Sequence, residues 1–462
     1  MRAHQEIWSE SLIRKYDLSG PRYTSYPTAV QFDESFGAKE CEKASQASRA
    51  ETTPLSLYVH LPFCAHVCYY CACNKVITKN REKAQPYLDD LYRDIRMQAK
   101  LFSNNRIVEQ LHWGGGTPTF ISHDQMRELM DQLRAQFNLL DDDSGDYSIE
   151  IDPREASFET LRILREIGFN RISLGVQDFN ETVQKAVNRV QSVEQTRAIL
   201  DGARELGFRS INLDLIYGLP FQTAVTFAET LKIVLDMSPD RLSVFNYAHM
   251  PQRFMPQRRI NEEDLPLPDQ KLIILQESID TLLNAGYHFI GMDHFAKPDD
   301  ELSVAQRNGQ LHRNFQGYTT HADCDLVAMG VSAISQVGHS YYQNHHDINL
   351  YQAAIQGGRL PVKRGVWLTE DDLIRKAVIM ELICQFSLDI ASFEASHKIT
   401  FASYFREELT YLGELEKDGL IALGGNKIEV LPPGRLLIRA ICKQFDAYIP
   451  KSQPVTGYSR II

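Results

Sequence analysis

The chain alternates short apolar runs with longer stretches in which Leu, Ile and Met recur every three or four residues. The short runs predict buried strands, and the longer stretches predict amphipathic helices. The expected strands are Leu55–His60, Val108–Trp113, Tyr147–Asp152, Asn170–Val176, Ser210–Tyr217 and Arg241–Ala248, and the pattern also permits His288–Met292. The expected helices are Ala84–Phe102, His123–Phe137, Ser157–Ile167, Ser192–Leu206 and Gln222–Asp236.

Strict alternation of strand and helix is typical of βα units, which build parallel sheets. Because each crossover turns right-handed, six or more consecutive units wrap into a full or partial barrel. We therefore predict an α/β fold, a partial (β/α) barrel of about six units with an amino-terminal arm and a mostly helical carboxy-terminal domain. Functional side chains should lie at the carboxyl ends of the strands.

The ends of the chain differ in pattern from this middle part. Residues 1–50 carry the turn-rich segment Ser19–Thr28 and predict an ordered arm, residues 51–365 hold the barrel, and residues 366–462 form a helical domain. Within that last domain, Gly419–Leu431 predicts two short strands around a Gly-Gly-Asn turn, a β wing. We expect the domain to cover the barrel mouth.

Charge argues against nucleic acid as a partner. The 462 residues hold 49 Lys and Arg against 60 Asp and Glu, a net charge of −11, and residues 369–462 hold 11 basic against 13 acidic residues with no basic run. A winged helix that binds DNA would need a basic face. No apolar run approaches the ~18 residues of a membrane span, and the start of the chain lacks the apolar stretch of a signal peptide. We expect a cytoplasmic monomer without a membrane span.

Four of the eight cysteines fall within ten residues directly after the first strand. Cys64, Cys68, Cys71 and Cys73 have the spacing C-x3-C-x2-C-x-C. A disulfide framework would spread its pairs along the chain, and structural zinc commonly takes two separated C-x2-C pairs. Buried structural thiols are a third alternative. An iron–sulfur cluster held by three thiolates on one loop fits the spacing better, since it leaves one iron open for a ligand.

Other polar or glycine-rich segments follow the later strands. They are Gly114–Thr119, Glu150, Gly175–Phe179, Asn188 with Arg189, Asp214 and Ala248. Three successive glycines let the backbone approach a ligand without a Cβ in the way. An acidic strand end is often only a helix cap. Convergence of so many polar groups on one barrel mouth is harder to explain by packing alone.

The C-x3-C-x2-C spacing resembles the radical S-adenosylmethionine superfamily, and nearly the whole chain is similar to one family in it, the oxygen-independent coproporphyrinogen III oxidases. The resemblance rests on Pro21–Thr28, Tyr58–His60, the four cysteines, His112–Thr117, Gly175–Asn180, Asn212–Gly218, Ser243–Ala248, Gly291–Ala296, Asn314–Tyr318 and Gly330–Ile334. Cys73 favours the oxidases over related haem chaperones, which carry Phe there. Tyr70 and Ala72 depart from the family form, which has Phe and Gly at these positions. If the backbone at position 72 needs a positive φ, alanine there would destabilise the loop by about 1 kcal/mol relative to glycine.

The resemblance implies the roles of individual residues. Cys64, Cys68 and Cys71 resemble the ligands of a [4Fe–4S] cluster, whereas Cys73 is not expected to hold iron. Residues similar to those that contact the S-adenosylmethionine on the cluster are Tyr58, Tyr70, Gly115, Thr117, Glu150 and Ile334. Residues similar to those of a second S-adenosylmethionine site are Gly116, Thr117, Gln177, Arg189, Asp214 and Ala248. His60 and Cys73 are candidate catalytic residues, and His60 is equally well explained as a satisfied strand-end histidine.

The implied reaction converts two propionates of coproporphyrinogen III to vinyl groups, giving protoporphyrinogen IX in haem synthesis. It proceeds through a 5′-deoxyadenosyl radical and needs an electron donor of unknown identity and two S-adenosylmethionine molecules per chain. Phe315 and Gln316 resemble a segment near the active site, and the candidate cations for the substrate carboxylates are Arg22, Arg253, Arg307 and Arg313. Cys324, Cys384 and Cys442 are expected to be packing thiols. Alternative functions on the same scaffold are a haem carrier and a radical methyltransferase that acts on haem.

Overall fold

The computed structural model describes residues 7–48, 53–450, 458 and 460. The chain forms two compact units. The barrel unit comprises Phe32–Tyr287 and Asp323–Trp367, and the terminal unit comprises Met1–Gln31, His288–Ala322 and Leu368–Ile462. The predicted arm is therefore shared between the two units, and its residues 1–6, 49 and 50 lie outside the described residues. The domain boundaries after residues 50 and 365 remain a prediction.

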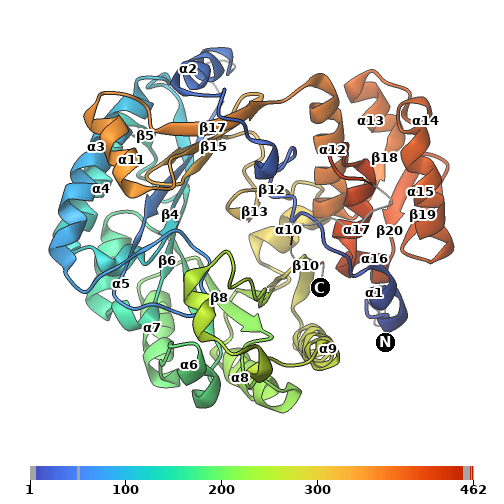
Figure 1. Cartoon of the computed structure of the whole chain (residues 1–462), viewed down its shortest axis with the longest axis horizontal. Coiled ribbons are helices and arrows are strands. Elements are labelled where there is room, and N and C mark those ends of the chain that lie inside the picture. The colour runs from blue at the N-terminus through green and yellow to red at the C-terminus, as the bar shows by residue number, and fades with distance from the viewer. Residues whose placement is uncertain (1–6, 49–52, 451–457, 459, 461–462) are drawn as a thin grey trace. The chain divides into compact units, whose positions relative to one another are not determined.

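All six predicted strands are present in the barrel unit and all are parallel. They are β1 (Leu55–Leu61), β4 (Ile107–Gly115), β6 (Asp146–Ile151), β7 (Arg171–Gln177), β8 (Ser210–Tyr217) and β9 (Arg241–Asn246). Neighbours in the sheet follow the chain in the order β9-β8-β7-β6-β4-β1. The partial barrel is therefore confirmed, and the carboxyl ends of the strands share one rim (Figure 1).

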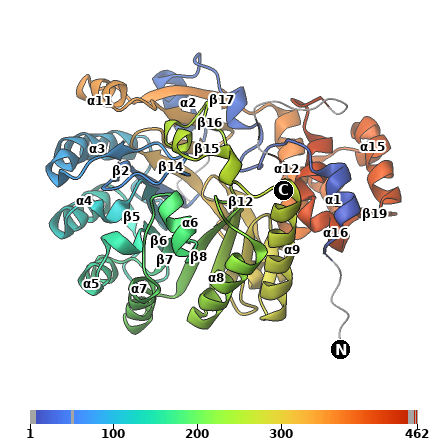
Figure 2. The ribbon, with the colours of Figure 1, turned by 60° about the horizontal axis from the view of Figure 1, so that its bottom comes forward.

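The five predicted helices cover the outer side of this sheet (Figure 1). They are α3 (Ala84–Ala99), α4 (His123–Gln136), α5 (Phe158–Glu166), α7 (Val193–Glu205) and α8 (Ala224–Met237). Four of them begin after a Ser or Thr whose hydroxyl accepts a hydrogen bond from the first turn. Two more helices, α6 (Glu181–Ala186) and α9 (Pro268–Asn284), were not predicted, and α9 follows α8 in the outer row in Figure 2.

The sheet continues on the other side of β1 with strands that sequence patterns did not reveal. These are β14 (Asp325–Met329), β15 (Ile334–Val337), β16 (Ser340–Asn344) and β17 (Val362–Trp367). The first runs parallel to β1, with Leu55 opposite Asp325, and the other three are antiparallel. The unit also contains β2 (Phe63–Cys64), β3 (Val76–Ile77), β5 (Asn138–Leu139), α2 (Ala38–Ala47) and α11 (Ile348–Gln356).

The terminal unit is mostly helical and carries the predicted wing. Its main elements are α1 (Glu10–Tyr16), β10 (His288–Gly291), β11 (His294–Ala296), α10 (Glu301–Arg307), β12 (His312–Asn314), β13 (Gly317–Thr319), α12 (Glu370–Gln385), β18 (Ser387–Asp389), α13 (Ile390–His397), α14 (Phe401–Tyr404), α15 (Arg406–Lys417), β19 (Ile421–Gly424), β20 (Lys427–Val430), α16 (Pro432–Leu436) and α17 (Ile438–Cys442). The wing is the β19–β20 hairpin, which β18 extends. Tyr23 of the arm donates a hydrogen bond to Asp446, 3.0 Å away. No helix of the described ranges is long and apolar enough to cross a membrane.

Candidate functional site

The cysteine loop is closed at its base immediately after β1. Strands β2 and β3 pair there, placing Phe63 opposite Val76 and Cys64 opposite Ile77. Lys75 bonds back onto the loop, with its Nζ 3.0 Å from the carbonyl oxygen of Cys71 and 3.2 Å from that of Cys73. The four thiols are therefore carried on a short, backbone-paired loop at the rim of the barrel.

The three predicted iron ligands lie close enough to influence one another. Burial raises the pKa of the Cys64 thiol to about 11, and the neighbouring Cys71 and Cys68 add to the shift. Cys73 hydrogen-bonds to the Cys71 sulfur and lowers the pKa of that thiol. All eight cysteines are free; Cys68 is buried, Cys64 and Cys71 are half-buried, and Cys73 is exposed. Three free thiols gathered on one loop are the donor set that a cubane with one open iron requires.

The glycine-rich turn at the end of β4 packs against this loop. The N–H of Gly116 donates to the Leu61 carbonyl at 2.8 Å, and the Thr117 hydroxyl lies 3.6 Å from the Cys64 sulfur. Gly115 has φ +115°, and a Cβ on it would lie 2.6 Å from the His60 ring. Glycine is therefore needed at position 115, where the backbone approaches the end of β1.

His60 joins two segments of the site. Its Nδ1 lies 3.0 Å from the Tyr58 hydroxyl and its Nε2 lies 3.1 Å from the Asn74 carbonyl oxygen. Since that carbonyl can only accept, Nε2 carries the proton and Nδ1 accepts from the tyrosine. Burial lowers the pKa of His60, which favours this neutral form. Both ring nitrogens are thus occupied, as a strand-end histidine with a positioning role requires, and a catalytic role for His60 stays a prediction.

Glu150 lies beside the glycine-rich turn as a charged acceptor. Its Oε2 accepts from the Gly115 N–H at 3.2 Å, and its Oε1 lies 3.4 Å from Nε2 of His112. Burial disfavours the carboxylate, but the hydrogen bond and charge of His112 and the N–H of Gly115 lower its pKa overall. The group is therefore ionised at neutral pH and suited to accept from the ammonium group of a ligand.

Arg189 connects β7 to the cysteine loop. Its Nη1 lies 3.0 Å from Oδ2 of Asp152 and 3.5 Å from the Cys68 sulfur, and its Nη2 donates to the Gly175 carbonyl. Burial disfavours the charge of Asp152, but Arg189 and Arg154 together lower the pKa of that carboxyl to about 2. The Nε of Arg189 is buried and has no hydrogen-bond partner among the described residues. This N–H is a donor whose hydrogen-bonding capacity the described residues leave unused.

Asp214 lies in the middle of β8 and accepts from two side chains. Ser173 donates to its Oδ2 at 3.0 Å and Asn212 donates to its Oδ1 at 2.8 Å. Burial raises the pKa of Asp214, although both hydrogen bonds oppose that shift. The neighbouring Gln177 ends β7 with φ +69°, an uncommon conformation for a residue other than glycine.

Sequence patterns missed Gln257, which joins two predicted site segments. Its Nε2 donates to the Tyr70 carbonyl at 2.9 Å and lies 3.3 Å from the Ala248 carbonyl oxygen, while its Oε1 accepts from the Met250 N–H. A single glutamine in a short 3₁₀ helix, Met255–Arg259, has no spacing signal that could have identified it. Ala72, where the sequence raised a concern about loop geometry, is not among the residues with positive φ.

Ile334 follows a turn whose backbone is hydrogen-bonded to side chains of helix α3. The Gly330 N–H and the Tyr351 hydroxyl both donate to Oδ2 of Asp94, each at 2.9 Å. The Tyr87 hydroxyl donates to the His60 carbonyl at 2.7 Å and accepts from the N–H of Val331. Helix α3 thereby fixes the ends of β1 and β14 relative to each other.

This buried network predicts an unusual pH dependence of stability. Burial raises the pKa of Asp94 from 3.8 to about 6. A carboxyl whose pKa is raised on folding stabilises the protein when protonated, and that stabilisation, about 3 kcal/mol, is complete below pH 3.8 and lost as pH rises through 6. Urea titrations of the wild type and Asp94→Asn between pH 4.5 and 7.5 should show the wild type losing stability relative to the variant as pH rises. Parallel pH profiles would contradict this reading.

The remaining candidates divide between the units. Arg253 lies in the barrel unit, whereas Arg22, Arg307, Arg313, Phe315 and Gln316 belong to the terminal unit. The Arg22 guanidinium pairs with Asp293, and that of Arg313 lies over the Tyr318 ring, 4.7 Å from its centroid. These arginines remain predictions as substrate contacts. Cys384 and Cys442 are buried, as expected of packing thiols, and Cys324 is half-buried.

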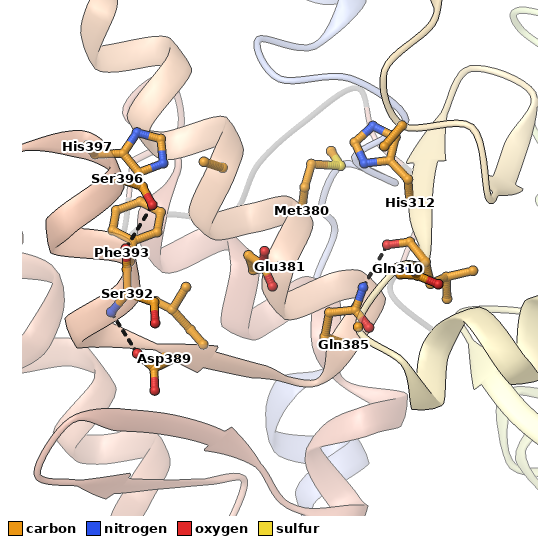
Figure 3. A pocket seen from close by; sticks show the side chains of 15 residues that line it. Gln310, His312, Met380, Glu381, Gln385, Asp389, Ser392, Phe393, Ser396 and His397 are labelled. Atoms are coloured by element: carbon orange, nitrogen blue, oxygen red, sulfur yellow. Dashed lines mark hydrogen bonds between the residues drawn. The ribbon is translucent and has the colours of Figure 1, made fainter.

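The terminal unit contains a cavity of about 400 Å³ between α12, α13 and residues 309–312 (Figure 3). Glu381 lies on its floor, and the ring of His397 packs 4.3 Å from that of Phe393 on one wall. None of the residues predicted to bind iron or cofactor lines this cavity. It is therefore separate from the candidate cofactor site, which lies in the barrel unit.

Comparison with known proteins identifies both parts of the chain. Residues 58–234 match the radical SAM superfamily, and residues 368–437 match the HemN C-terminal domain. Radical SAM enzymes use a [4Fe–4S] cluster and S-adenosylmethionine, and the thiols of the cysteine loop fit such a cluster. The chain is similar over nearly its full length to proteins named oxygen-independent coproporphyrinogen III oxidase. That of Pseudomonas aeruginosa is 59% identical over 455 residues, covering 98% of this chain and 99% of the relative.

Two further relatives agree with this result. The protein of the same name from Escherichia coli K12 is 52% identical over 462 residues, covering all of both chains. The solved structure titled coproporphyrinogen III oxidase (HemN) from Escherichia coli, a radical SAM enzyme, aligns with a TM-score of 0.91 at 51% identity, covering 96% of this chain and 99% of that one. This chain belongs to the family of oxygen-independent coproporphyrinogen III oxidases.

Proposed function

We propose that the chain catalyses the oxygen-independent oxidative decarboxylation of two propionates of coproporphyrinogen III to vinyl groups, giving protoporphyrinogen IX for haem synthesis. The observation that carries the proposal is the 59% identity to an oxidase of that name over 98% of the chain. When bound, the cluster and S-adenosylmethionine supply the 5′-deoxyadenosyl radical that takes hydrogen from the propionate β-carbon before CO2 and one further electron leave. The protein must hold the reacting groups in place and exclude water.

Three thiolates would hold the cluster, and backbone and side chains around them would orient the first S-adenosylmethionine. Cys64, Cys68 and Cys71 are the proposed ligands, and three protein ligands would leave one iron open to S-adenosylmethionine. Glu150 is ionised and bonded to the backbone N–H of the half-buried Gly115, and its carboxylate can also accept from the ammonium group. Tyr58, Tyr70, Thr117 and Ile334 complete this proposed site.

A second S-adenosylmethionine is proposed beside the first, so that each chain binds two. The supporting observation is the buried Nε of Arg189, a charged donor without a partner among the described residues. Asp214 offers carboxylate oxygens from β8, which pairs with β7. Gln257 bonds to the carbonyls of both Ala248 and Tyr70 and so holds Ala248 near the cysteine loop. Gly116, Thr117 and Gln177 belong to the same proposed set. Two propionates must react, and each radical step consumes one cofactor molecule.

Asp214→Ala should weaken one of two S-adenosylmethionine binding events and leave the cluster intact. Loss of a hydrogen bond to a charged group costs about 1–3 kcal/mol, or roughly a 5- to 150-fold weaker dissociation constant. Anaerobic equilibrium binding of S-adenosylmethionine to the reconstituted enzyme measures both events. The matched control is Asp236→Ala on the exposed side of α8, where the carboxylate forms an ion pair with Arg197. A single site in the wild type, or two unaltered sites in the variant, would remove the second site.

The proposed reaction is tested by its product. Anaerobic incubation of the reconstituted enzyme with coproporphyrinogen III, S-adenosylmethionine and a reductant should give protoporphyrin after oxidation, detected by its absorbance. Its mass should be lower by two CO2 and four hydrogen atoms than that of coproporphyrin, which the same oxidation gives from unreacted substrate. A haem carrier would bind haem without product, and a methyltransferase would add methyl mass. The eight cysteines are all free, which suits a reducing compartment, and we therefore place the protein in the cytoplasm. The proposal further includes action as a monomer and use of an external electron donor.

A further inference from the structure

Two guanidinium groups approach the sulfur of Cys68, the most buried of the proposed cluster ligands. Nη1 of Arg189 lies 3.5 Å from this sulfur and Nη2 of Arg154 lies 3.7 Å from it. Arg154 was not among the site residues predicted from the sequence, and the role expected for Arg189 is contact with a second S-adenosylmethionine rather than with a thiolate. Both N–H groups are donors, and a thiolate sulfur is an acceptor.

A single carboxylate holds the two like charges together. Oδ2 of Asp152 accepts from Nη2 of Arg154 at 2.7 Å and from Nη1 of Arg189 at 3.0 Å. Nε of Arg154 also donates to Oδ1 of Asp152 at 3.0 Å, which makes the contact a two-pronged fork. The three side chains are at most 13% exposed. The one carboxylate and two guanidinium groups together carry a net charge of +1 next to Cys68.

The backbone places Arg154 for this contact. Asp152 directly follows β6 and caps the turn that begins at Pro153. Its Oδ1 also accepts from the Arg154 backbone N–H at 3.0 Å, so the carboxylate fixes both ends of the arginine. An arginine held at its backbone and at its guanidinium loses little freedom when it donates to a sulfur. Asp152 therefore holds Arg154 in place through bonds that do not involve Cys68.

We propose that Asp152, Arg154 and Arg189 form a charge clamp on Cys68 that raises the reduction potential of the cluster, with Arg154 as a positioning residue. The inference rests on the proposed ligation of iron by Cys68. Reduction adds one electron to the cluster and removes one from the external donor, so the cluster becomes more negative. Hydrogen bonds to ligand sulfur and nearby positive charge stabilise the more negative state. The clamp thus makes the cluster easier to reduce.

Arg154→Gln tests the clamp by removing its charge. The reconstituted variant should hold the wild-type amount of iron and sulfide, and its midpoint potential, measured by a redox titration followed by electron paramagnetic resonance without S-adenosylmethionine, should be more negative than that of the wild type. Arg154→Lys keeps the charge but not the fork and should give an intermediate potential. The matched control is Arg162→Gln at an exposed position of α5, where the arginine pairs with Glu159 and Glu166. This variant should keep the wild-type potential.

The possible results separate this inference from the proposed function. A wild-type potential in Arg154→Gln with a full cluster would overturn the clamp. If Arg154→Gln does not retain a cluster, Arg154→Lys decides, and an unshifted potential there overturns the clamp as well. Absence of any cluster from the wild-type protein would instead contradict the proposed function.

Discussion

Single replacement of Cys64, Cys68 or Cys71 by serine should abolish the iron–sulfur absorbance of the reconstituted protein, whereas Cys73→Ser should retain it. A hydroxyl is a poor substitute for a thiolate on iron, and a cubane held by only two protein thiolates is not retained. Three ligands leave one iron open for S-adenosylmethionine, and a fourth would close it. Iron and sulfide content, with the visible spectrum, measures the outcome after anaerobic reconstitution.

Cys73→Ser is itself the closest control, because it also replaces a cysteine sulfur by oxygen on the same loop. Cys324→Ser provides a second control, on a half-buried thiol elsewhere in the barrel unit. Thermal unfolding of the metal-free proteins should be similar for all five variants, so that loss of cluster is not confused with loss of fold. Loss of the cluster from Cys73→Ser, or its retention in any of the other three loop variants, would require a different ligand set.

The barrel was predictable because its signals repeat. Each βα unit pairs an apolar run with an amphipathic helix, and the helices begin at a hydroxyl side chain such as Ser122 or Thr223. Strand β14 lacks such support, since its partner β1 lies far away in the sequence and its neighbour β15 is only four residues long. Short strands paired over long distances are specified by tertiary packing more than by local pattern.

The candidate site was predictable where spacing carries information. Cysteines at C-x3-C-x2-C and three successive glycines stand out because few other arrangements explain them. Gln257 and Arg154 carry no such pattern, and their roles follow only from the carbonyl and thiol groups that the fold brings to them. Asp152 was predicted only as the last residue of a strand, whereas it caps the following turn and holds two arginines.

Gly115→Ala should severely weaken S-adenosylmethionine binding and destabilise the site. Alanine is strained at φ +115°, and its Cβ would lie 2.6–2.9 Å from three atoms of the His60 ring. That ring cannot move freely, because Tyr58 and the Asn74 carbonyl hold its two nitrogens. Backbone strain and overpacking each cost about 1–3 kcal/mol, giving roughly 2–6 kcal/mol together. Anaerobic binding titrations and urea unfolding measure how this cost divides between affinity and stability.

Two further variants separate the strain from the clash. Gly207 has φ +76° with no atom within 4 Å of an added Cβ, so Gly207→Ala carries backbone strain alone and should cost less than Gly115→Ala. His60→Ala removes the atoms that the new Cβ would meet. The double variant should therefore be free of the clash and keep only the backbone strain, which gives a coupling of about 1–3 kcal/mol in a double-mutant cycle. Equal costs for Gly115→Ala and Gly207→Ala, with no coupling to His60→Ala, would show that the ring and the turn do not constrain each other. The close approach of β1 and the glycine-rich turn would then have no part in shaping the cofactor site.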